Sequence, residues 1–332
     1  MTSRTCWGSS FGFGVAGVQW NVLHAAGIFA VGFGVAWAAG VWATARMLAR
    51  PPRRGYGWAL AKGRASNPME MEPPRAYETW SVRSRGVDLP VWDVRGDVAG
   101  GETLVLTPGW SDSRVTMLGR VGVLARVCGR VVVWDPPGHG EAGGRCELGA
   151  REWEDLLAIA ERADEDGRGV LLYGYSMGAG ISLAAASRGR DGLVKGVIAE
   201  APYRRPDTPA RNVLHRSGLP WRLTLPVALG LSGVRAGVGW RWRGFDRGAL
   251  AGEAHRRGIG VLVLVGEEDG VCPPAESSAV AMAGMGKLVV IPGAGHADLW
   301  DDAWRAGACL EAVREVVAAW AGGAKEGPPG AH

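Results

Sequence analysis

The sequence predicts an α/β fold with a mostly parallel, doubly wound sheet, and three observations indicate it. Short Val/Leu-rich runs alternate with helical patterns along most of the chain, an order that is typical of a parallel sheet covered by helices. The motif G-x-S-x-G, at Gly174–Gly178, stands between one such run and an Ala-rich segment at Ala179–Ser187. Once an N-terminal segment is set aside, about 250 residues remain, which is enough for a single core.

The first part of the chain carries a predicted transmembrane helix at residues 22–45, after an N-terminal segment at 1–21. No charged residue lies between Arg4 and Arg46. The apolar stretch is long enough to cross a hydrocarbon core of about 30 Å at about 1.5 Å per residue. A cleaved signal peptide is the alternative, because Ala43–Ala45 offers a small-x-small cleavage site.

Basic residues are concentrated on the C-terminal side of this predicted helix. Residues 46–76 are rich in Pro, Gly and Arg, and we interpret them as a linker. Because positive residues next to a span stay in the cytoplasm, we expect an outside N-terminus and a cytoplasmic folded domain, held on the membrane by a single pass. Under the signal-peptide alternative the same domain would be secreted.

The folded domain is predicted at residues 77–321, ahead of a tail at 322–332 whose composition is typical of disorder. Glu78–Asp93 alternates polar and apolar residues around Arg85–Gly86, which predicts an antiparallel hairpin. Further strands are predicted at residues 103–107, 130–134, 170–173, 194–199, 260–265 and 287–291. Helices are predicted at about 115–127, 150–165, 178–188, 274–284 and 299–320. The interval 204–248 breaks this alternation, and we expect it to form a small cap inserted after the sixth strand.

Ser176 is the candidate nucleophile. A G-x-S-x-G at a strand-to-helix junction is typical of the nucleophile elbow, a sharp turn that lifts the serine hydroxyl above the edge of the sheet. Gly174 and Gly178 have no Cβ, so the strand and the helix can approach closely enough to make the turn. Because the motif also occurs by chance, the assignment depends on partner residues further along the chain.

An acid and a base follow in the order that such an elbow requires, Ser, then Asp or Glu, then His. Asp269 lies just past the predicted strand at 260–265, and His296 lies just past the strand at 287–291. Loops at the carboxyl ends of parallel strands gather at one edge of a sheet. We therefore expect Ser176, Asp269 and His296 to meet there.

Two backbone N–H donors complete such a site, because they bind the oxyanion that forms when a serine attacks a carbonyl. Loss of one donor typically raises the barrier by about 3 kcal/mol. The candidates are Met177, the residue after the nucleophile, and Trp110, in the loop after an early strand. Glu267 and Glu268, beside Asp269, remain alternatives for the acid.

From about Tyr77 to Trp320 the chain resembles the α/β-hydrolases, and within them the Bem46-like serine hydrolases, a branch grouped with the prolyl-oligopeptidase-type peptidases. The matching pieces follow the order of that family and are PGWSDS (108–113), VVVWDPPGHGEAGG (131–144), GYSMGAG (174–180), VIAEAPY (197–203), the strand and turn ending in GEEDGVCPP (266–274), and IPGAGHADLW (291–300). The resemblance implies an α/β-hydrolase fold, and it favours Asp269 as the acid because the family pattern of Gly, two residues and Asp lands on it. The sequence departs from the family at Pro108–Gly109, where His-Gly is usual, and at Glu200, where aspartate is commoner.

The predicted cap carries aromatic and basic residues. Trp221, Trp240 and Trp242 are candidates for an apolar substrate pocket, and the alternative is that they attach the cap to the core. Four arginines are typical of a solvated basic face, with an anionic group of the substrate as the alternative partner: Arg235, Arg241, Arg243 and Arg247.

Composition narrows the classes of partner. The five cysteines are an odd number with no CxxC pair, which argues against a disulfide framework and a structural zinc site. The net charge of +4 comes without a basic domain, so we expect no nucleic-acid partner. No metal, nucleotide or flavin motif stands out, so we expect no metal and no cofactor.

Together these features predict a serine hydrolase that cleaves an ester, thioester or amide through an acyl-enzyme. Carboxylester or acyl-lipid hydrolysis is favoured, because the membrane helix and the apolar cap suit a small or lipid-like acyl substrate. The alternatives are a serine peptidase of the prolyl-oligopeptidase type and a binding protein that keeps the fold without turnover.

Overall fold

The computed structural model describes residues 15–218 and 221–321. At its centre is an eight-stranded sheet with the order β1-β2-β4-β3-β5-β6-β7-β8. The pairs β1–β2 and β2–β4 are antiparallel, and the strands from β4 to β8 run parallel. The strands are β1 (Tyr77–Ser84), β2 (Val87–Arg95), β3 (Thr103–Thr107), β4 (Arg130–Trp134), β5 (Val170–Tyr175), β6 (Val194–Glu200), β7 (Gly260–Gly266) and β8 (Lys287–Ile291). The fold class predicted from the sequence is confirmed.

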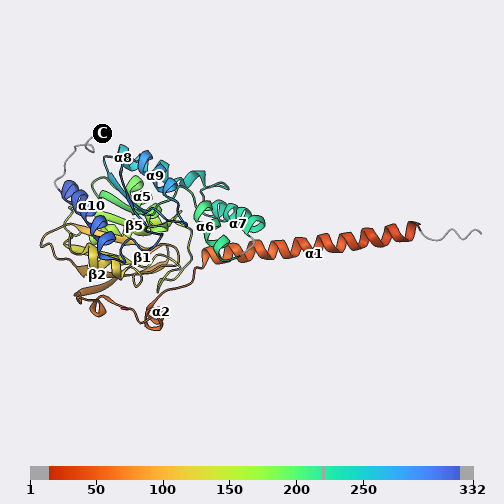
Figure 1. The fold of residues 1–332 in the computed structure, drawn as a ribbon, viewed down its shortest axis with the longest axis horizontal. Helices are drawn as coiled ribbons and strands as arrows, with labels where there is room; N and C mark the ends of the chain where they lie inside the picture. The colour runs from red at the N-terminus through yellow and green to blue at the C-terminus, as the bar shows by residue number, and fades with distance from the viewer. Residues whose placement is uncertain (1–14, 219–220, 322–332) are drawn as a thin grey trace, which may run out of the picture.

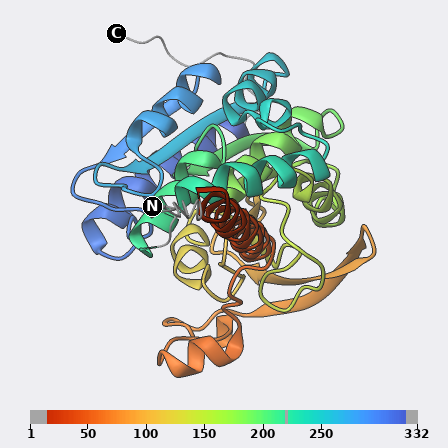
Figure 2. The ribbon, with the colours of Figure 1, turned by 90° about the vertical axis from the view of Figure 1, so that its right-hand side faces the viewer.

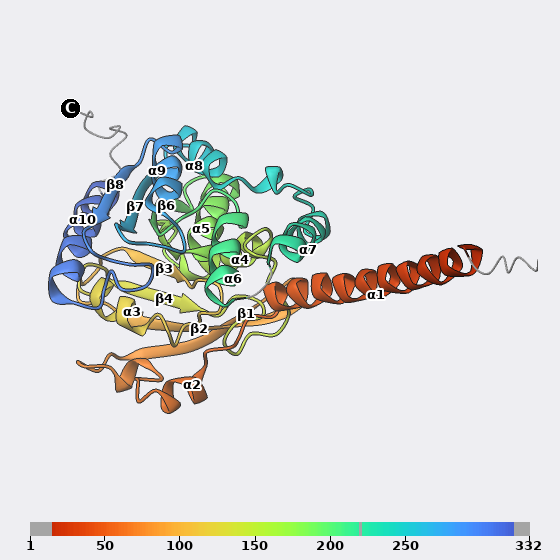
Figure 3. The same cartoon turned by 45° about the vertical axis from the view of Figure 1, so that its right-hand side comes forward.

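Helices cover both faces of the sheet, which explains why the central strands are apolar on both sides (Figure 3). The domain helices are α3 (Leu118–Leu124), α4 (Glu152–Ala163), α5 (Met177–Arg188), α8 (Arg247–Arg256), α9 (Pro274–Ala283) and α10 (Ala303–Ala321). Leu156 of α4, Ile181 of α5 and Val280 of α9 share one buried cluster. Val121 of α3 and Val313 of α10 belong to a second cluster, on the opposite face.

The predicted cap is helical. It consists of α6 (Asp207–Arg216) and α7 (Trp221–Arg235), followed by a short 3-10 turn at Arg243–Phe245. The cap leaves the sheet after β6, as the sequence predicts, so it follows the strand next to β5 and the elbow.

The predicted transmembrane segment lies within one long helix, α1 (Val15–Ala49). This helix projects away from the domain (Figure 1), and every residue from 24 to 39 is exposed. The stretch His24–Ala49 is long and apolar enough to cross a membrane. The start of the N-terminal segment, residues 1–14, and the tail at 322–332 lie outside the described residues.

The segment predicted as a linker packs on the domain rather than standing free. It contains a short helix, α2 (Tyr56–Ala61), and Ala59 is completely buried. The Ser111 hydroxyl donates a hydrogen bond to the Pro52 carbonyl at 2.9 Å, and Arg75 pairs with Asp97 at 2.8 Å. Composition alone favours a spacer, but these long-range contacts fix where α1 leaves the domain.

Candidate active site

Ser176 sits in the sharp turn between β5 and α5. Its backbone, at φ 53° and ψ −107°, is in a region that costs a non-glycine residue about 1–3 kcal/mol. Its N–H donates a hydrogen bond to the Glu200 carbonyl at 2.8 Å, which holds the turn. A Cβ on Gly174 or Gly178 would lie closer than 3.0 Å to the carbonyl oxygens of Gly178 and Thr107, respectively. Only glycine therefore fits on either side of the serine.

Asp269 and His296 lie in the loops that follow β7 and β8, and the fold brings both to Ser176. The His296 Nε2 atom is 3.2 Å from the Ser176 Oγ atom. The His296 Nδ1 atom is 2.7 Å from Asp269 Oδ2. The other carboxylate oxygen of Asp269 accepts hydrogen bonds from the N–H groups of Val271 and Cys272, at 2.9 and 2.7 Å. This carboxylate is thus held in place from both sides.

The two alternative acids are placed elsewhere. Glu267 and Glu268 are both exposed, and the Glu267 carboxylate accepts a hydrogen bond from the Gly293 N–H at 3.1 Å. Within the described residues, Asp269 is the acid of these three that contacts His296. The geometry therefore favours the same acid as the family resemblance.

Cys272 is buried next to the candidate nucleophile, with its Sγ atom 4.0 Å from Ser176 Oγ. Asp269, Cys272 and His296 carry atoms of metal-ligand type within 4.8 Å of one another. Burial raises the pKa of the Cys272 thiol well above its usual range, which disfavours the thiolate that a metal site needs. We therefore interpret Cys272 as a packed thiol.

The two predicted oxyanion donors lie on neighbouring segments. Met177 is the first residue of α5, where backbone N–H groups have no acceptor inside the helix. Trp110 follows β3, and Gly178 packs against Thr107 at the end of that strand. The Trp110 indole donates a hydrogen bond to the Leu48 carbonyl at the end of α1, at 3.0 Å. Through this bond the predicted oxyanion loop is connected to the N-terminal helix.

Comparison with known proteins shows where this arrangement belongs. Residues 104–308 match the profile of the alpha/beta hydrolase family. The chain belongs to that family. No curated protein matches it.

Solved structures similar to this hydrolase include esterases at low identity. An esterase of Pyrococcus furiosus is 18% identical with a TM-score of 0.61, over 81% of this chain and 98% of the other. An esterase of a Rhodococcus species is 18% identical with a TM-score of 0.54, over 74% and 99%. A carboxylesterase structure from the thaumarchaeon Nitrososphaera gargenis is 17% identical with a TM-score of 0.53, over 73% and 99%. At this identity the likeness establishes the fold.

A buried polar network that the sequence did not reveal lies next to β5 and the turn that carries Ser176. The carboxylate of Glu200, at the end of β6, accepts hydrogen bonds from Arg120 Nε at 2.7 Å and from the Trp300 indole at 3.0 Å. The Tyr173 hydroxyl donates to the same carboxylate. These partners lie 27 to 100 residues from Glu200 in the sequence. The sequence signal for this network is one charged residue, Glu200, at the end of the apolar strand β6.

This network extends toward the histidine through an aromatic ring. The Arg120 guanidinium lies over the Tyr175 ring at 4.3 Å from its centre, and the ring centre is 5.2 Å from that of His296. Arg120 and Glu200 are both buried, and a buried pair of this kind is costly to break because it leaves one charge alone. The network thus holds Tyr175, the ring that packs against His296, in place.

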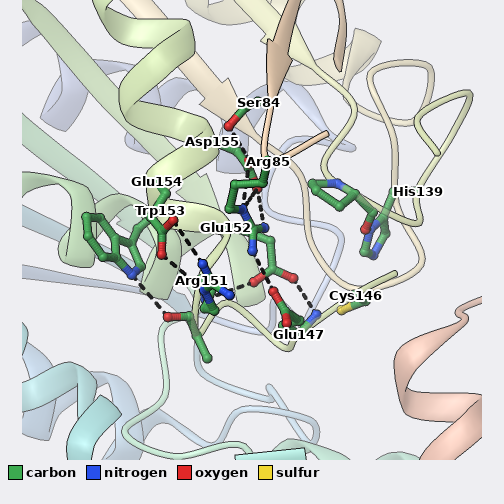
Figure 4. Close-up of polar contacts among 12 residues, drawn as sticks. Ser84, Arg85, His139, Cys146, Glu147, Arg151, Glu152, Trp153, Glu154 and Asp155 are labelled. Atoms are coloured by element: carbon green, nitrogen blue, oxygen red, sulfur yellow. Dashed lines mark hydrogen bonds and ion pairs between the residues drawn. The ribbon is translucent and has the colours of Figure 1, made fainter. Parts of the chain in front are cut away.

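A second polar cluster joins the β1–β2 turn to the start of α4 (Figure 4), and its acids Glu152 and Asp155 are buried. Arg85 pairs with Asp155 at 2.5 Å and with Glu147 at 2.7 Å. The Glu152 carboxylate accepts a hydrogen bond from the Glu147 N–H at 2.6 Å. Because Glu152 is completely buried, desolvation raises its pKa to about 7.

The three predicted pocket tryptophans have different environments. Trp242 is buried, and its indole donates to the Leu229 carbonyl at 2.9 Å. Trp240 is half exposed and packs on Gly230. Trp221 is partly buried against the core. Trp240 and Trp242 thus contact α7, and a role of any of the three in substrate binding stays a prediction.

One of the four cap arginines does not lie on a solvated face. Arg247 is completely buried at the start of α8, whereas Arg235, Arg241 and Arg243 are exposed. The Arg247 Nη2 atom donates a hydrogen bond to the Leu148 carbonyl at 2.9 Å. The Arg247 guanidinium lies 4.1 Å from the centre of the Tyr203 ring. The expectation of a solvated side chain was wrong for Arg247, because its guanidinium contacts the Leu148 carbonyl and the aromatic rings of Tyr203 and Phe245 in place of water.

Proposed function

We propose that this alpha/beta hydrolase is a serine hydrolase that works through an acyl-enzyme. The observation that carries the proposal is the continuous chain of hydrogen bonds from Ser176 through His296 to Asp269, with the serine on a strained elbow. Nucleophile, base and orienting acid in this order are the recurring arrangement of such enzymes.

In the proposed mechanism, His296 Nε2 takes the proton of Ser176 as the serine oxygen attacks the substrate carbonyl. Asp269 orients the imidazole and stabilises its positive charge. The N–H groups of Met177 and Trp110 bind the oxyanion. The protonated His296 then gives its proton to the leaving group, and afterwards it activates a water molecule that releases the acyl group from the serine.

We propose a carboxylester or acyl-lipid as the substrate class. The similar structures described above include esterases, and the apolar helix α1 beside the cap suits a substrate with an acyl chain. We further propose that α1 anchors the enzyme in a membrane by a single pass, with the domain in the cytoplasm, and that the chain belongs to the Bem46-like branch.

Labelling with a fluorophosphonate tests the nucleophile. Such a probe reacts with the activated serine of a serine hydrolase, so it should label the wild-type chain and leave Ser176→Ala unlabelled. The variant should also lose at least about a thousand-fold in turnover of a short-chain ester. Ser182→Ala is the matched control, because Ser182 is a buried serine further along the same helix. Equal labelling of the wild type and Ser176→Ala would contradict the assignment.

A further inference from the structure

The cap helix α7 exposes apolar side chains along one face. Leu223, Leu231 and Val234 are exposed to 60%, 51% and 57%. At about 100° per residue, they lie within a sector of about 80° around the helix. The opposite face carries Leu225, Ala228 and Leu229, which are all buried. Leu225 and Leu229 belong to the core cluster that includes Met177. Helix α7 is therefore apolar on both sides, although one side faces solvent. We call Leu223, Leu231 and Val234 the outer stripe.

The outer stripe begins where α7 contacts the candidate membrane helix. The Trp37 indole donates a hydrogen bond to the Leu223 carbonyl at 2.9 Å. The Thr44 hydroxyl donates to the Thr224 hydroxyl at 3.0 Å. In Figure 2, where α1 points toward the viewer, α7 runs across the view beside it. An α1 that crosses a bilayer would thus place α7 along the surface of that bilayer.

The aromatic residues of α1 indicate the level of this surface. Trp37 and Trp42 are both exposed, and tryptophan is enriched at the boundary between lipid and water. Trp37 contacts α7 and lies near the end of the fully exposed stretch 24–39, ahead of residue 45, where the sequence predicts the span to end. The start of the outer stripe therefore lies at the height of the expected headgroup region.

The segment of the chain that contains the outer stripe carries charge of one sign. Residues 208–245 contain six arginines and no acidic residue, and no acidic residue precedes Glu70 in the chain. Arg222 and Arg235, at the two ends of α7, are both exposed. Anionic lipid headgroups attract such basic clusters. An apolar stripe flanked by arginines is typical of a helix that lies in a membrane interface.

We propose that α7 is an interfacial helix that docks on the surface of an anionic bilayer beside the anchor, with the outer stripe among the acyl chains and the flanking arginines among the headgroups. This inference rests on the proposed membrane anchoring by α1. Leu225 and Leu229, on the inner face of α7, belong to the same buried cluster as Met177. Docking therefore places the bilayer on the opposite side of α7 from this cluster.

Depth-dependent quenching in vesicles tests the proposal directly. The full chain carrying Cys6→Ser and Leu231→Cys is labelled with an environment-sensitive fluorophore, since the other four cysteines are buried. It is reconstituted into phosphatidylcholine vesicles with and without phosphatidylglycerol, and brominated acyl chains serve as the quencher. Met282→Cys is the control, because Met282 lies on α9 of the domain and is 73% exposed. We expect quenching at position 231 to exceed that at 282 at least three-fold, and to increase with phosphatidylglycerol.

Equal quenching at the two positions would overturn the proposal. A fluorophore at 231 that is shielded in detergent in a concentration-dependent way would overturn it in favour of a second copy of the chain. Quenching should be unchanged when Ser176→Ala is added to the labelled chain. Failure of the proposed catalysis can therefore be distinguished from failure of the proposed docking. A carbonate wash that releases the wild-type chain would show instead that α1 is not an anchor.

A kinetic measurement provides a second readout. The double variant Leu231→Asp, Val234→Asp should lower turnover of a lipid ester held in anionic vesicles about ten-fold relative to turnover of a water-soluble short-chain ester. Met282→Asp should leave that ratio unchanged. A ratio equal to that of the wild type in the double variant would contradict docking through the outer stripe.

Discussion

At the scale of single residues, the candidate site depends on how tightly each polar group is held. Asp269 uses one oxygen for His296 and the other for two backbone N–H groups, so its position does not depend on a flexible partner. Glu267 and Glu268 have one more methylene group each and are exposed. Neighbouring acids in one turn therefore differ in their capacity to orient a histidine.

The first residue-scale prediction separates these acids. Asp269→Ala should lower turnover of a short-chain ester by several orders of magnitude, because the imidazole loses its orienting and charge-stabilising partner. The double variant Asp269→Ala, His296→Ala should cost little more than the worse single change, since the residues act as one unit. Glu268→Ala is the control and should stay within about two-fold of the wild type. A severe loss in Glu268→Ala with near-normal Asp269→Ala would reassign the acid.

The second residue-scale prediction concerns the buried Glu152. Its pKa is raised from 4.5 to about 7 by burial, so between these values the folded state binds more protons than the unfolded state. The free energy of unfolding should therefore fall as pH rises through this window, by up to roughly 3 kcal/mol, and level off above it. Glu152→Gln should flatten the dependence, as measured by thermal unfolding in detergent from pH 5 to 8. An equal dependence of stability on pH in the wild type and in Glu152→Gln would refute this role of Glu152.

At the scale of elements, the elbow is where strand, turn and helix must fit together. The start of α5 approaches the end of β3 so closely that Gly178 lies against the Thr107 carbonyl. This contact brings the loop carrying Trp110 next to the nucleophile. The strained backbone conformation of Ser176 is maintained because the packing of the neighbouring strands and helix fixes the path of the turn.

A glycine substitution tests this packing. Gly178→Ala should destabilise the protein by at least about 1–3 kcal/mol, because the added methyl group overlaps the backbone of β3. Gly119→Ala is the matched control, since Gly119 lies in α3 with no atom within 4 Å of an added Cβ. In a helix this change should be neutral or stabilising, by up to about 1 kcal/mol. Thermal unfolding of both variants decides the point, and equal midpoints would argue against the close packing.

At the scale of the whole molecule, α1 and the cap form one assembly with the domain. Helix α1 contacts α7 through Trp37 and Thr44, and its last turn binds Trp110 through the Leu48 carbonyl. The segment after it is packed on the domain. The distance between the candidate site and the proposed membrane surface is therefore fixed by the fold rather than by a flexible tether.

The orientation across the membrane is the prediction at this scale. Arg46 lies in the last turn of α1 and Arg50, Arg53 and Arg54 follow it closely, whereas Arg4 alone precedes it. Because positive residues stay in the cytoplasm, the domain should be cytoplasmic. A C-terminal reporter that is active only in the cytoplasm should be active in carbonate-washed membranes. An inactive reporter with a soluble, N-terminally trimmed product would favour the signal-peptide alternative.

The sequence by itself determined the strands and their positions along the chain, because short apolar runs bounded by turn residues are typical of buried strands. Every strand predicted between 103 and 291 is present, with β5, β6 and β7 one or two residues longer than expected. It also supplied Ser176, Asp269 and His296 as candidates, since a local turn motif and two strand ends are readable without knowledge of the packing.

Only the tertiary structure decided which groups meet across the chain. The contact of Asp269 rather than Glu268 with His296 depends on the direction of side chains in one turn. Arg120 and Glu200 are 80 residues apart and have no local pattern that pairs them. The burial of Arg247 and the contact of α7 with α1 likewise arise from packing between distant segments. Periodicity and motifs report local preferences, whereas such pairings depend on how the layers come together in three dimensions.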